Sequence, residues 1–249
     1  MSGHSKWHSI KHKKAATDAK RGRIFTRLLK EISVAARHGG GDLNANSRLR
    51  TVVATAKAAN MPADNIKKAI QRGTGELPGV VFEEVTYEAY GPGGVAIYLE
   101  VVSDNKNRTV AELRHVVSKH GGNLAESGSV AWIFHKKGYF VIDKSQGTEE
   151  KLMELALDAG ADDLREEEGN YEVYSAPDSF YKVKEALEKN SIQLVTSEIS
   201  MVPQTLVKLE GKSAQQMLKL MEALEDHEDV QHVWANFDIS AEEMEMATA

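Results

Sequence analysis

The first third of the chain has the apolar periodicity of a helix. Within residues 22–41 the apolar side chains recur three or four positions apart, which places them on one helical face. They are Ile24, Phe25, Leu28, Leu29, Ile32, Ala35 and Ala36. The glycines at 39–41 predict the end of this helix, because glycine readily adopts the left-handed conformation that closes helices.

Two further helices are predicted from shorter periodic segments. One covers 44–61, and the other covers 61–73, where Pro62 suits the first turn and Gly73 the end. The candidate N-caps of the first are Asn44, Asn46 and Ser47. Three helices joined by brief loops predict a small bundle.

A glycine- and proline-rich linker at 73–80 precedes a change to strand alternation. Residues 82–102 predict a hairpin of two strands that turns at 91–94. A helix is predicted over 107–122 and a strand over 128–134.

Residues 138–200 form a more regular unit, in which strand, helix, two hairpin strands, helix and strand follow in order. This order is that of the ferredoxin-like arrangement. Residues 205–239 then add a strand, a helix and a strand, which need partners in another sheet. We therefore expect them to complete the sheet that the strands of 82–134 begin.

The patterns together predict an α+β fold class, with an N-terminal three-helix domain and two ferredoxin-like α+β domains, one inserted in the other. The predicted domains are a basic helical domain at 1–79, a discontinuous α+β domain at 80–135 and 204–240, and an inserted ferredoxin-like domain at 136–203.

Charge divides the chain in the same place. Residues 1–72 hold 16 Lys and Arg against 4 Asp and Glu, a net charge of +12, whereas the remainder carries −18 and the total is −6. Such asymmetry favours a basic head that binds a polyanion. The alternative is that the two halves of the molecule dock on one another.

The candidate nucleic-acid-binding residues lie in a basic arm and on the polar face of the first helix. They are Lys6, Trp7, His8, Lys11, Lys13 and Lys14 in the arm, and Lys20, Arg21, Arg23, Arg27, Lys30 and Arg37 on the helix. Lys and Arg neutralise phosphates, and an interleaved Trp can stack on a base. We call the helical set Lys20, Arg23, Arg27, Lys30 and Arg37 the basic stripe and expect it to face solvent.

Two loops are candidate second contacts. Gly91, Pro92, Gly93 and Gly94 form a tight turn that requires glycine for positive φ, and the same turn can let a backbone approach closely. Asp104, Asn105, Lys106, Asn107 and Arg108 lie where a strand passes into a helix, whose N-terminal amides can hold an anion. Helix capping explains part of the second loop without any function.

Several kinds of chemistry are excluded or unsupported. The chain has no cysteine, no phosphate-binding glycine loop and no nucleophile elbow. His4, His8 and His12 have helical spacing, but the surrounding lysines would repel a metal ion. We therefore expect no enzyme activity, cofactor, metal or small-molecule substrate. No apolar run is long enough to span a membrane, and no secretory signal is evident, so a cytoplasmic protein is expected.

Five segments, in order, resemble the YebC/PmpR family, which includes a mitochondrial translational activator of cytochrome oxidase subunit synthesis. The segments are MSGHSKWHSIKHKKAATDAKRGRIFTRLLKEI, NMPADNIKKAIQRG, YEAYGPGGVAIYLE, DNKNRTVAELRHVVSKHGGNLAESGSVAWIF and LEDHEDVQHVWANFD. The resemblance covers nearly the whole chain. It implies three domains and a cytoplasmic, non-enzymatic regulator.

The resemblance implies two functions between which the sequence does not choose. Members are commonly described as transcriptional regulators that bind promoter DNA, which is our leading hypothesis. Others act in translation on the ribosome, so the alternative is an rRNA-binding translation factor or translational activator. Phosphate contacts are common to DNA and RNA. A third hypothesis is an acidic adaptor that binds another protein through its C-terminal sheets.

Overall fold

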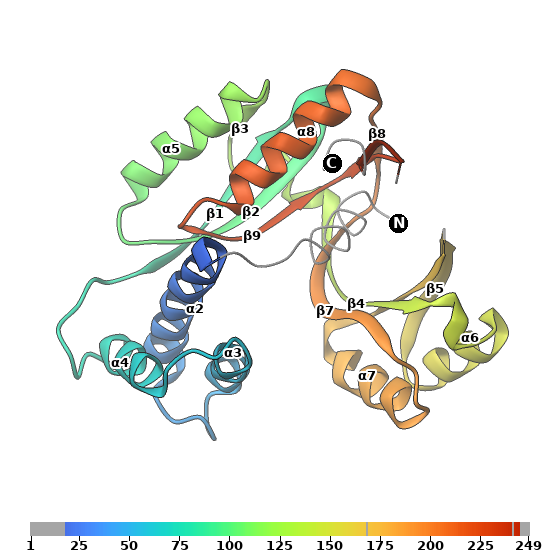
Figure 1. Ribbon diagram of the computed structural model, residues 1–249, viewed down its shortest axis with the longest axis horizontal. Coiled ribbons are helices and arrows are strands. Elements are labelled where there is room, and N and C mark those ends of the chain that lie inside the picture. The colour runs from blue at the N-terminus through green and yellow to red at the C-terminus, as the bar shows by residue number, and fades with distance from the viewer. Residues whose placement is uncertain (1–17, 168, 241, 245–249) are drawn as a thin grey trace.

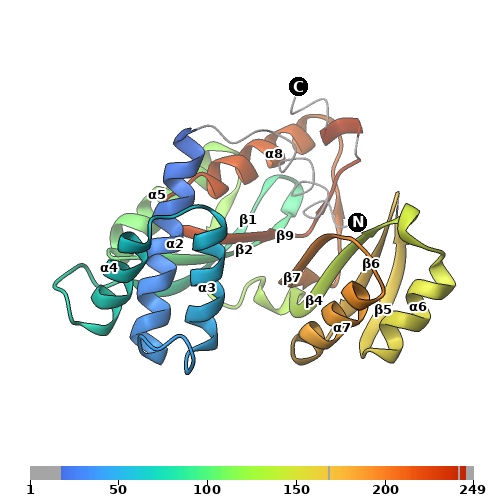
Figure 2. The same ribbon diagram turned by 60° about the horizontal axis from the view of Figure 1, so that its bottom comes forward.

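The computed structural model describes residues 18–167, 169–240 and 242–244. A helical N-terminal region leads into a first sheet covered by helices, and a second sheet lies at the opposite end of the molecule (Figures 1 and 2). The predicted α+β class is confirmed, because the helices come first and the two large sheets are both antiparallel.

The helical region consists of α2 (Asp18–Gly39), α3 (Ser47–Ala58) and α4 (Ala63–Thr74). Its core contains Ile32 and Leu49, which are fully buried. Asn46 is the N-cap of α3, since its side-chain oxygen accepts the N–H of Leu49 at 3.0 Å. The Asn46 amide nitrogen donates to the carbonyl of Ala35 at 2.8 Å, so one buried side chain also ties α3 to α2.

The end of α4 differs from the prediction. The helix passes through Gly73 and ends at Gly75, which has the left-handed φ of 83°. Gly73 instead allows α4 to pack closely on α2, because a Cβ at this position would lie 2.3 Å from the carbonyl oxygen of Ser33 on α2. The Ser33 hydroxyl donates to the carbonyl of Ala69 at 3.0 Å across the same contact. The absence of a side chain at 73 therefore sets how closely α2 and α4 approach.

The first sheet has the strand order β3-β1-β2-β9. Its strands are β1 (Glu83–Tyr90), β2 (Ala96–Ser103), β3 (Asn123–Ala125) and β9 (Val230–Ala235). Helices α5 (Lys106–Lys119) and α8 (Gly211–Glu225) pack on one face over a buried core (Figure 1). The short strands β8 (Val207–Lys208) and β10 (Phe237–Asp238) pair in parallel nearby.

The predicted strand at 128–134 is wrong. The strand β3 ends before this segment, at Ala125, residues Ala131–Ile133 form a 3₁₀ turn, and the next strand begins only at Phe134. The buried carboxylate of Glu88 accepts the N–H groups of Gly128 and Val130 at 2.6 Å and of Ala131 at 2.9 Å. These bonds curl the backbone around one side chain of β1, which the local alternation of apolar residues could not indicate.

The second sheet has the strand order β5-β6-β4-β7. Its elements are β4 (Phe134–Asp143), β5 (Ala161–Glu167), β6 (Asn170–Ser175), β7 (Leu194–Pro203), α6 (Glu149–Asp158) and α7 (Phe180–Lys189). The rings of Phe140 and Phe180 stack at 5.0 Å in a core separate from that of the first sheet. Short 3₁₀ turns cover Pro92–Gly94, Lys144–Gln146 and Pro177–Ser179.

Strand β9 pairs with β2, so the first sheet combines segments that lie before and after the second sheet in the chain. The Trp234 indole N–H donates to the Ser200 hydroxyl at 3.0 Å, which links the two sheets. The domain boundaries proposed from the sequence stay a prediction, and the boundary at 135 falls inside β4. None of the described helices combines the length and apolar character needed to cross a bilayer.

Replacement of Gly73 by Ala should destabilise the fold. The new methyl group would overlap the Ser33 carbonyl, and overpacking typically costs about 1–3 kcal/mol. The matched control is Gly22→Ala in α2, which meets nothing within 4 Å and should stabilise by up to about 1 kcal/mol. Urea denaturation measures both free energies of unfolding, and changes of the same sign would contradict the packing role of Gly73.

Candidate nucleic-acid interface and the joint behind it

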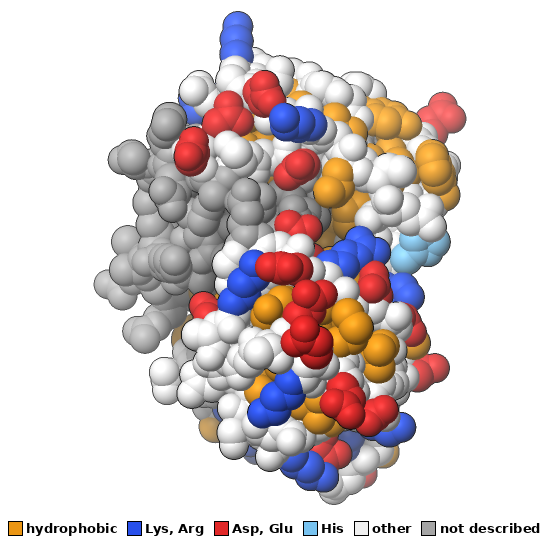
Figure 3. Space-filling view, turned by 90° about the vertical axis from the view of Figure 1, so that its right-hand side faces the viewer, with side chains coloured by type: hydrophobic (Ala, Val, Ile, Leu, Met, Phe, Trp, Pro, Cys, Tyr) orange, Lys and Arg blue, Asp and Glu red, His pale blue; other side chains and the backbone are white. Residues whose placement is uncertain are grey.

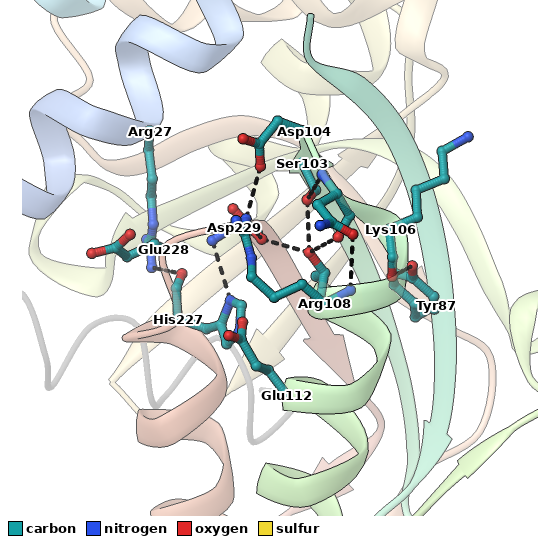
Figure 4. Close-up of polar contacts among 12 residues, drawn as sticks. Arg27, Tyr87, Ser103, Asp104, Lys106, Arg108, Glu112, His227, Glu228 and Asp229 are labelled. Atoms are coloured by element: carbon teal, nitrogen blue, oxygen red, sulfur yellow. Dashed lines mark hydrogen bonds and ion pairs between the residues drawn. The ribbon is translucent and has the colours of Figure 1, made fainter. Parts of the chain in front are cut away.

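The carboxylate of Asp229, just before β9, bonds cations and a hydroxyl from two different helices. Its side chain is only 3% exposed. One oxygen accepts the Lys30 ammonium at 2.5 Å, and the other accepts the Thr109 hydroxyl at 2.6 Å and the Arg108 guanidinium at 3.2 Å. Figure 4 shows the Arg108 and Asp229 side chains directed toward one another. Three elements, α2, α5 and the loop after α8, therefore meet at one carboxylate. We call this cluster of Lys30, Arg108, Thr109 and Asp229 the joint.

The environment of Asp229 strongly favours its ionised form. Burial by itself raises the pKa of a carboxyl group, but the hydrogen bonds from Lys30 and Thr109 and the positive charge of Lys30 outweigh burial. The pKa of Asp229 falls from 3.8 to about 2 as a result. Asp229 is thus ionised at neutral pH, where its charge faces the Lys30 ammonium.

The loop before Asp229 extends the joint along α2. Lys30 also donates to the Glu228 carbonyl at 3.1 Å. Arg27 donates to the His227 carbonyl at 3.4 Å (Figure 4). One turn earlier, Arg23 pairs with Asp226 at 3.4 Å. Burial lowers the pKa of Arg27, although Glu225 and Asp226 oppose this shift. Arg23, Arg27 and Lys30 thus all face the acidic end of α8.

The prediction that the basic stripe faces solvent is therefore wrong for its centre. Lys30 is buried against Asp229, and Arg23 and Arg27 are half-buried. Arg37 is exposed and donates to the Phe82 carbonyl at 3.3 Å. A helical projection shows which side chains share a face, but the segment that covers Lys30 comes 199 positions later in the chain. At this joint the basic and acidic halves of the chain dock on one another, which is the alternative that the charge asymmetry left open.

The remaining residues predicted in the arm and at the start of α2 have no described side chains. Lys6, Trp7, His8, Lys11, Lys13 and Lys14 lie outside the described residues, as do the side chains of Lys20 and Arg21. Their contact with nucleic acid stays a prediction.

The loop at 104–108 is largely engaged within the protein. Asn105 caps α5 by accepting the N–H of Arg108 at 3.1 Å, and Lys106 pairs with Glu83. Arg108 also bonds Asp104 at 2.8 Å in addition to Asp229. Both cations of the loop therefore pair with carboxylates of the protein, although their side chains stay about half exposed. Contact of this loop with nucleic acid stays a prediction.

The turn at 91–94 shows the glycine requirement that the sequence indicated. Gly93 and Gly94 have φ of 71° and 79°. Pro92 is buried, and a Cβ at Gly91 would lie 2.8 Å from the sulfur of Met217. Only the tip of this turn, Gly93 and Gly94, is exposed to solvent.

Exposed cations lie instead on α3 and α4, whose side chains were not among the predicted contact residues. They are Arg48, Arg50, Lys57, Lys67, Lys68 and Arg72. Arg48 pairs with Glu84, Lys68 pairs with Asp64, and Arg50 donates to the Leu43 carbonyl at 2.9 Å. The side chains of the other three, Lys57, Lys67 and Arg72, form no ion pair with a described residue. The signal was available, because Arg50 and Lys57 lie seven positions apart and Lys68 and Arg72 four apart, both helical spacings.

A cleft of about 670 Å³ separates the helical region from the open face of the first sheet and from β7. Its charged lining consists of Glu31, Glu84, Glu100, Arg48 and Lys136. Arg48 bonds Glu84 and lowers the pKa of that carboxyl, whereas burial raises the pKa of Glu31 and Glu100. The charged lining of the cleft thus has no excess of Lys and Arg that would attract phosphate.

Glu112, His227 and Asp229 bring ligand atoms within 4.8 Å of one another, a spacing that could suit a metal ion. Their atoms are already engaged, because His227 bonds Glu112 at 3.1 Å and accepts the Asp229 N–H at 3.2 Å. Lys30 and Arg108 add positive charge at the same point. The group is suited to a hydrogen-bonded joint and not to a metal centre.

The face on the side of the second sheet carries mixed charge. Figure 3 shows Asp and Glu side chains interspersed with Lys and Arg over the part of this surface that is coloured by type, with hydrophobic side chains between them. A polyanion is attracted to clustered charge of one sign. This face therefore lacks the concentration of exposed Lys and Arg side chains that α3 and α4 carry.

The fold and its charge distribution define a class of protein, an α+β protein with a basic helical region at its N-terminus. Two family models match the chain, the "TACO1/YebC protein N-terminal domain" over residues 5–76 and the "TACO1/YebC second and third domain" over 82–237. The chain belongs to the TACO1/YebC family.

Curated relatives match over almost their whole length. A "Probable transcriptional regulatory protein" of Geobacter sulfurreducens is 59% identical over 245 residues, covering 98% of this chain and 99% of the relative. One of Syntrophus aciditrophicus with the same description is 57% identical over 250 residues, covering 100% of both chains. The crystal structure of a conserved hypothetical protein from Aquifex aeolicus has a TM-score of 0.79 at 47% identity, covering 93% of this chain and 96% of that one.

Replacement of Asp229 by Asn should destabilise the protein by about 3–5 kcal/mol at neutral pH, because Lys30 would be left buried without a counter-charge. The depressed pKa of Asp229 contributes about 2 kcal/mol of stability above its unfolded value of 3.8, which is lost as the pH falls toward about 2. The difference between wild type and D229N should therefore shrink between about pH 4 and pH 2.

Chemical denaturation across this pH range measures the effect. The matched control is Asp226→Asn, which removes a half-exposed carboxylate from the same loop and should change stability by less than about 1 kcal/mol. Equal effects of the two substitutions would contradict the central role of Asp229.

Proposed function

We propose that this protein is a non-enzymatic, nucleic-acid-binding regulator of transcription in the cytoplasm that contacts DNA through its helical region. The observation that carries the proposal is the exposure of Lys57, Lys67 and Arg72 on α3 and α4 without an ion pair to a described residue. The other cations of the helical region whose side chains are described each bond a carboxylate or a carbonyl of the protein. The names of the relatives support a regulatory role.

The contact is expected to be with the nucleic-acid backbone. Lys57, Lys67 and Arg72 are long, exposed cations that form no ion pair with a described residue, and they can neutralise phosphates and release counterions. Such contacts position a protein on nucleic acid without reading its sequence. The arm of residues 1–17 would add further positive charge to the same end of the chain.

The triple variant Lys57→Gln, Lys67→Gln, Arg72→Gln should bind duplex DNA more weakly than wild type. Its slope of log affinity against log salt should flatten by about 1 for each phosphate that the variant no longer neutralises. Filter retention between low and physiological salt measures both quantities.

The matched control carries the same charge change elsewhere, as Lys151→Gln, Lys182→Gln and Lys212→Gln on α6, α7 and α8, where all three lysines are exposed. It should retain the affinity and the slope of the wild type. Identical behaviour of both triple variants would reject α3 and α4 as the contact surface.

The alternative target is ribosomal RNA, which offers the same phosphate chemistry. Gradient sedimentation of a cell lysate separates the two. Migration with ribosomal subunits after DNase treatment would support a role in translation. Protection of specific promoter sequences at physiological salt would support the proposed role in transcription.

A further inference from the structure

Trp132 is the most exposed large hydrophobic side chain among the described residues. It is 66% exposed and lies in the 3₁₀ turn between β3 and β4. Exposure of a single Leu or Val is ordinary, but indole is the largest side chain, and Trp is the aromatic residue most often used in recognition. Recognition by this ring would require that its exposed position is fixed by the surrounding structure.

The loop that carries Trp132 is built around a buried charge. Glu88 is 4% exposed, and its carboxylate accepts N–H groups on both sides of the turn, from Gly128, Val130 and Ala131. Burial alone would raise the pKa of Glu88, but these backbone hydrogen bonds outweigh it and keep the pKa low. A buried carboxylate that is fully hydrogen-bonded fixes the backbone directly before and after Ser129.

Ser129 in turn orients the indole ring. Its carbonyl oxygen accepts the Trp132 indole N–H at 3.0 Å and the Tyr90 hydroxyl at 3.2 Å. The only hydrogen-bond donor of the indole is therefore used within the loop. What Trp132 offers to a partner is the apolar surface of a ring held in a fixed direction.

The surroundings of Trp132 are polar. Glu126, Ser127 and Gly128 are exposed before it, and His135 and Lys136 are exposed directly after it on β4. The core of a protein interface gathers several apolar side chains and excludes charge. A single fixed aromatic ring near cationic or hydrogen-bonding side chains is typical of surfaces that stack on nucleic-acid bases.

We propose that Trp132 is a stacking platform for an unpaired base of RNA or single-stranded DNA. The inference rests on the proposed function, since it assigns to the nucleic acid a second contact, in the 3₁₀ turn between β3 and β4. Stacking would use the π-face of the base, so the contact tolerates any base sequence.

The experiment uses the full chain labelled with 5-fluorotryptophan, which gives one ¹⁹F resonance for each of the three Trp residues. Disappearance of one resonance in Trp132→Phe assigns the signal of Trp132. The probes are the 12-mers rA12 and dA12 and an abasic 12-mer with the same phosphate charge. The Trp132 resonance should shift with rA12, dA12 or both, and should not shift with the abasic strand.

Affinity gives the second readout. Trp132→Ala should bind the responding 12-mer roughly tenfold more weakly, while Trp132→Phe should retain most of the affinity because a ring remains. The control is Tyr181→Ala, which removes an aromatic ring that is 65% exposed on α7 and should bind as wild type does. Thermal melting of each variant checks that the fold is intact.

The outcomes separate the two proposals. Salt-dependent binding of wild type with no shift of the Trp132 resonance and unchanged affinity in Trp132→Ala overturns the stacking platform and leaves the proposed function standing. Equal shifts with the abasic strand also overturn it. Failure of the wild type to bind any 12-mer or duplex overturns both. If Trp132→Ala binds normally but no longer retains a protein partner from nuclease-treated lysate, the ring belongs to a protein interface and stacking is rejected.

Discussion

The buried ion pair between Lys30 and Asp229 is the interaction on which the arrangement of this protein depends. A carboxylate that is 3% exposed must be compensated, and the compensation comes from α2 and from α5. If α2 moved, both charges would be left in a poorly solvated place. The pair thus fixes the helical region against the first sheet. The Thr109 hydroxyl donates a hydrogen bond to the Asp229 oxygen that Lys30 does not contact.

This joint separates the described cations of the helical region into two sets. Arg23, Arg27 and Lys30 of α2 bond the acidic end of α8 and the loop that follows it. The cations of α3 and α4 stay exposed, whereas the charged lining of the cleft combines three carboxylates with two cations. The exposed cations of α3 and α4 are thus the ones that the proposed contact with nucleic acid can use.

Glu88 plays a comparable part at the other end of the first sheet. Asp229 joins elements through side-chain donors, whereas Glu88 holds a loop through backbone N–H groups. Each carboxylate is buried and each has its pKa held below the ordinary value by its donors. One consequence is a fixed position for Trp132, whose ring would otherwise move with a free loop. The two buried carboxylates thus hold in place parts of the protein that are exposed to solvent, namely the helical region and the loop of Trp132.

The sequence by itself determined the local elements, because periodicity, caps and turn residues act within a few positions. It indicated the α+β class and included Asn46 among three candidate caps. It failed at Gly73 and over 128–134, where a partner far along the chain decides the backbone: the Ser33 carbonyl excludes a side chain, and Glu88 curls a turn. Only the tertiary structure decided which face of α2 is covered. An ion pair such as that of Lys30 forms between residues remote in sequence, and no local pattern records what packs against them.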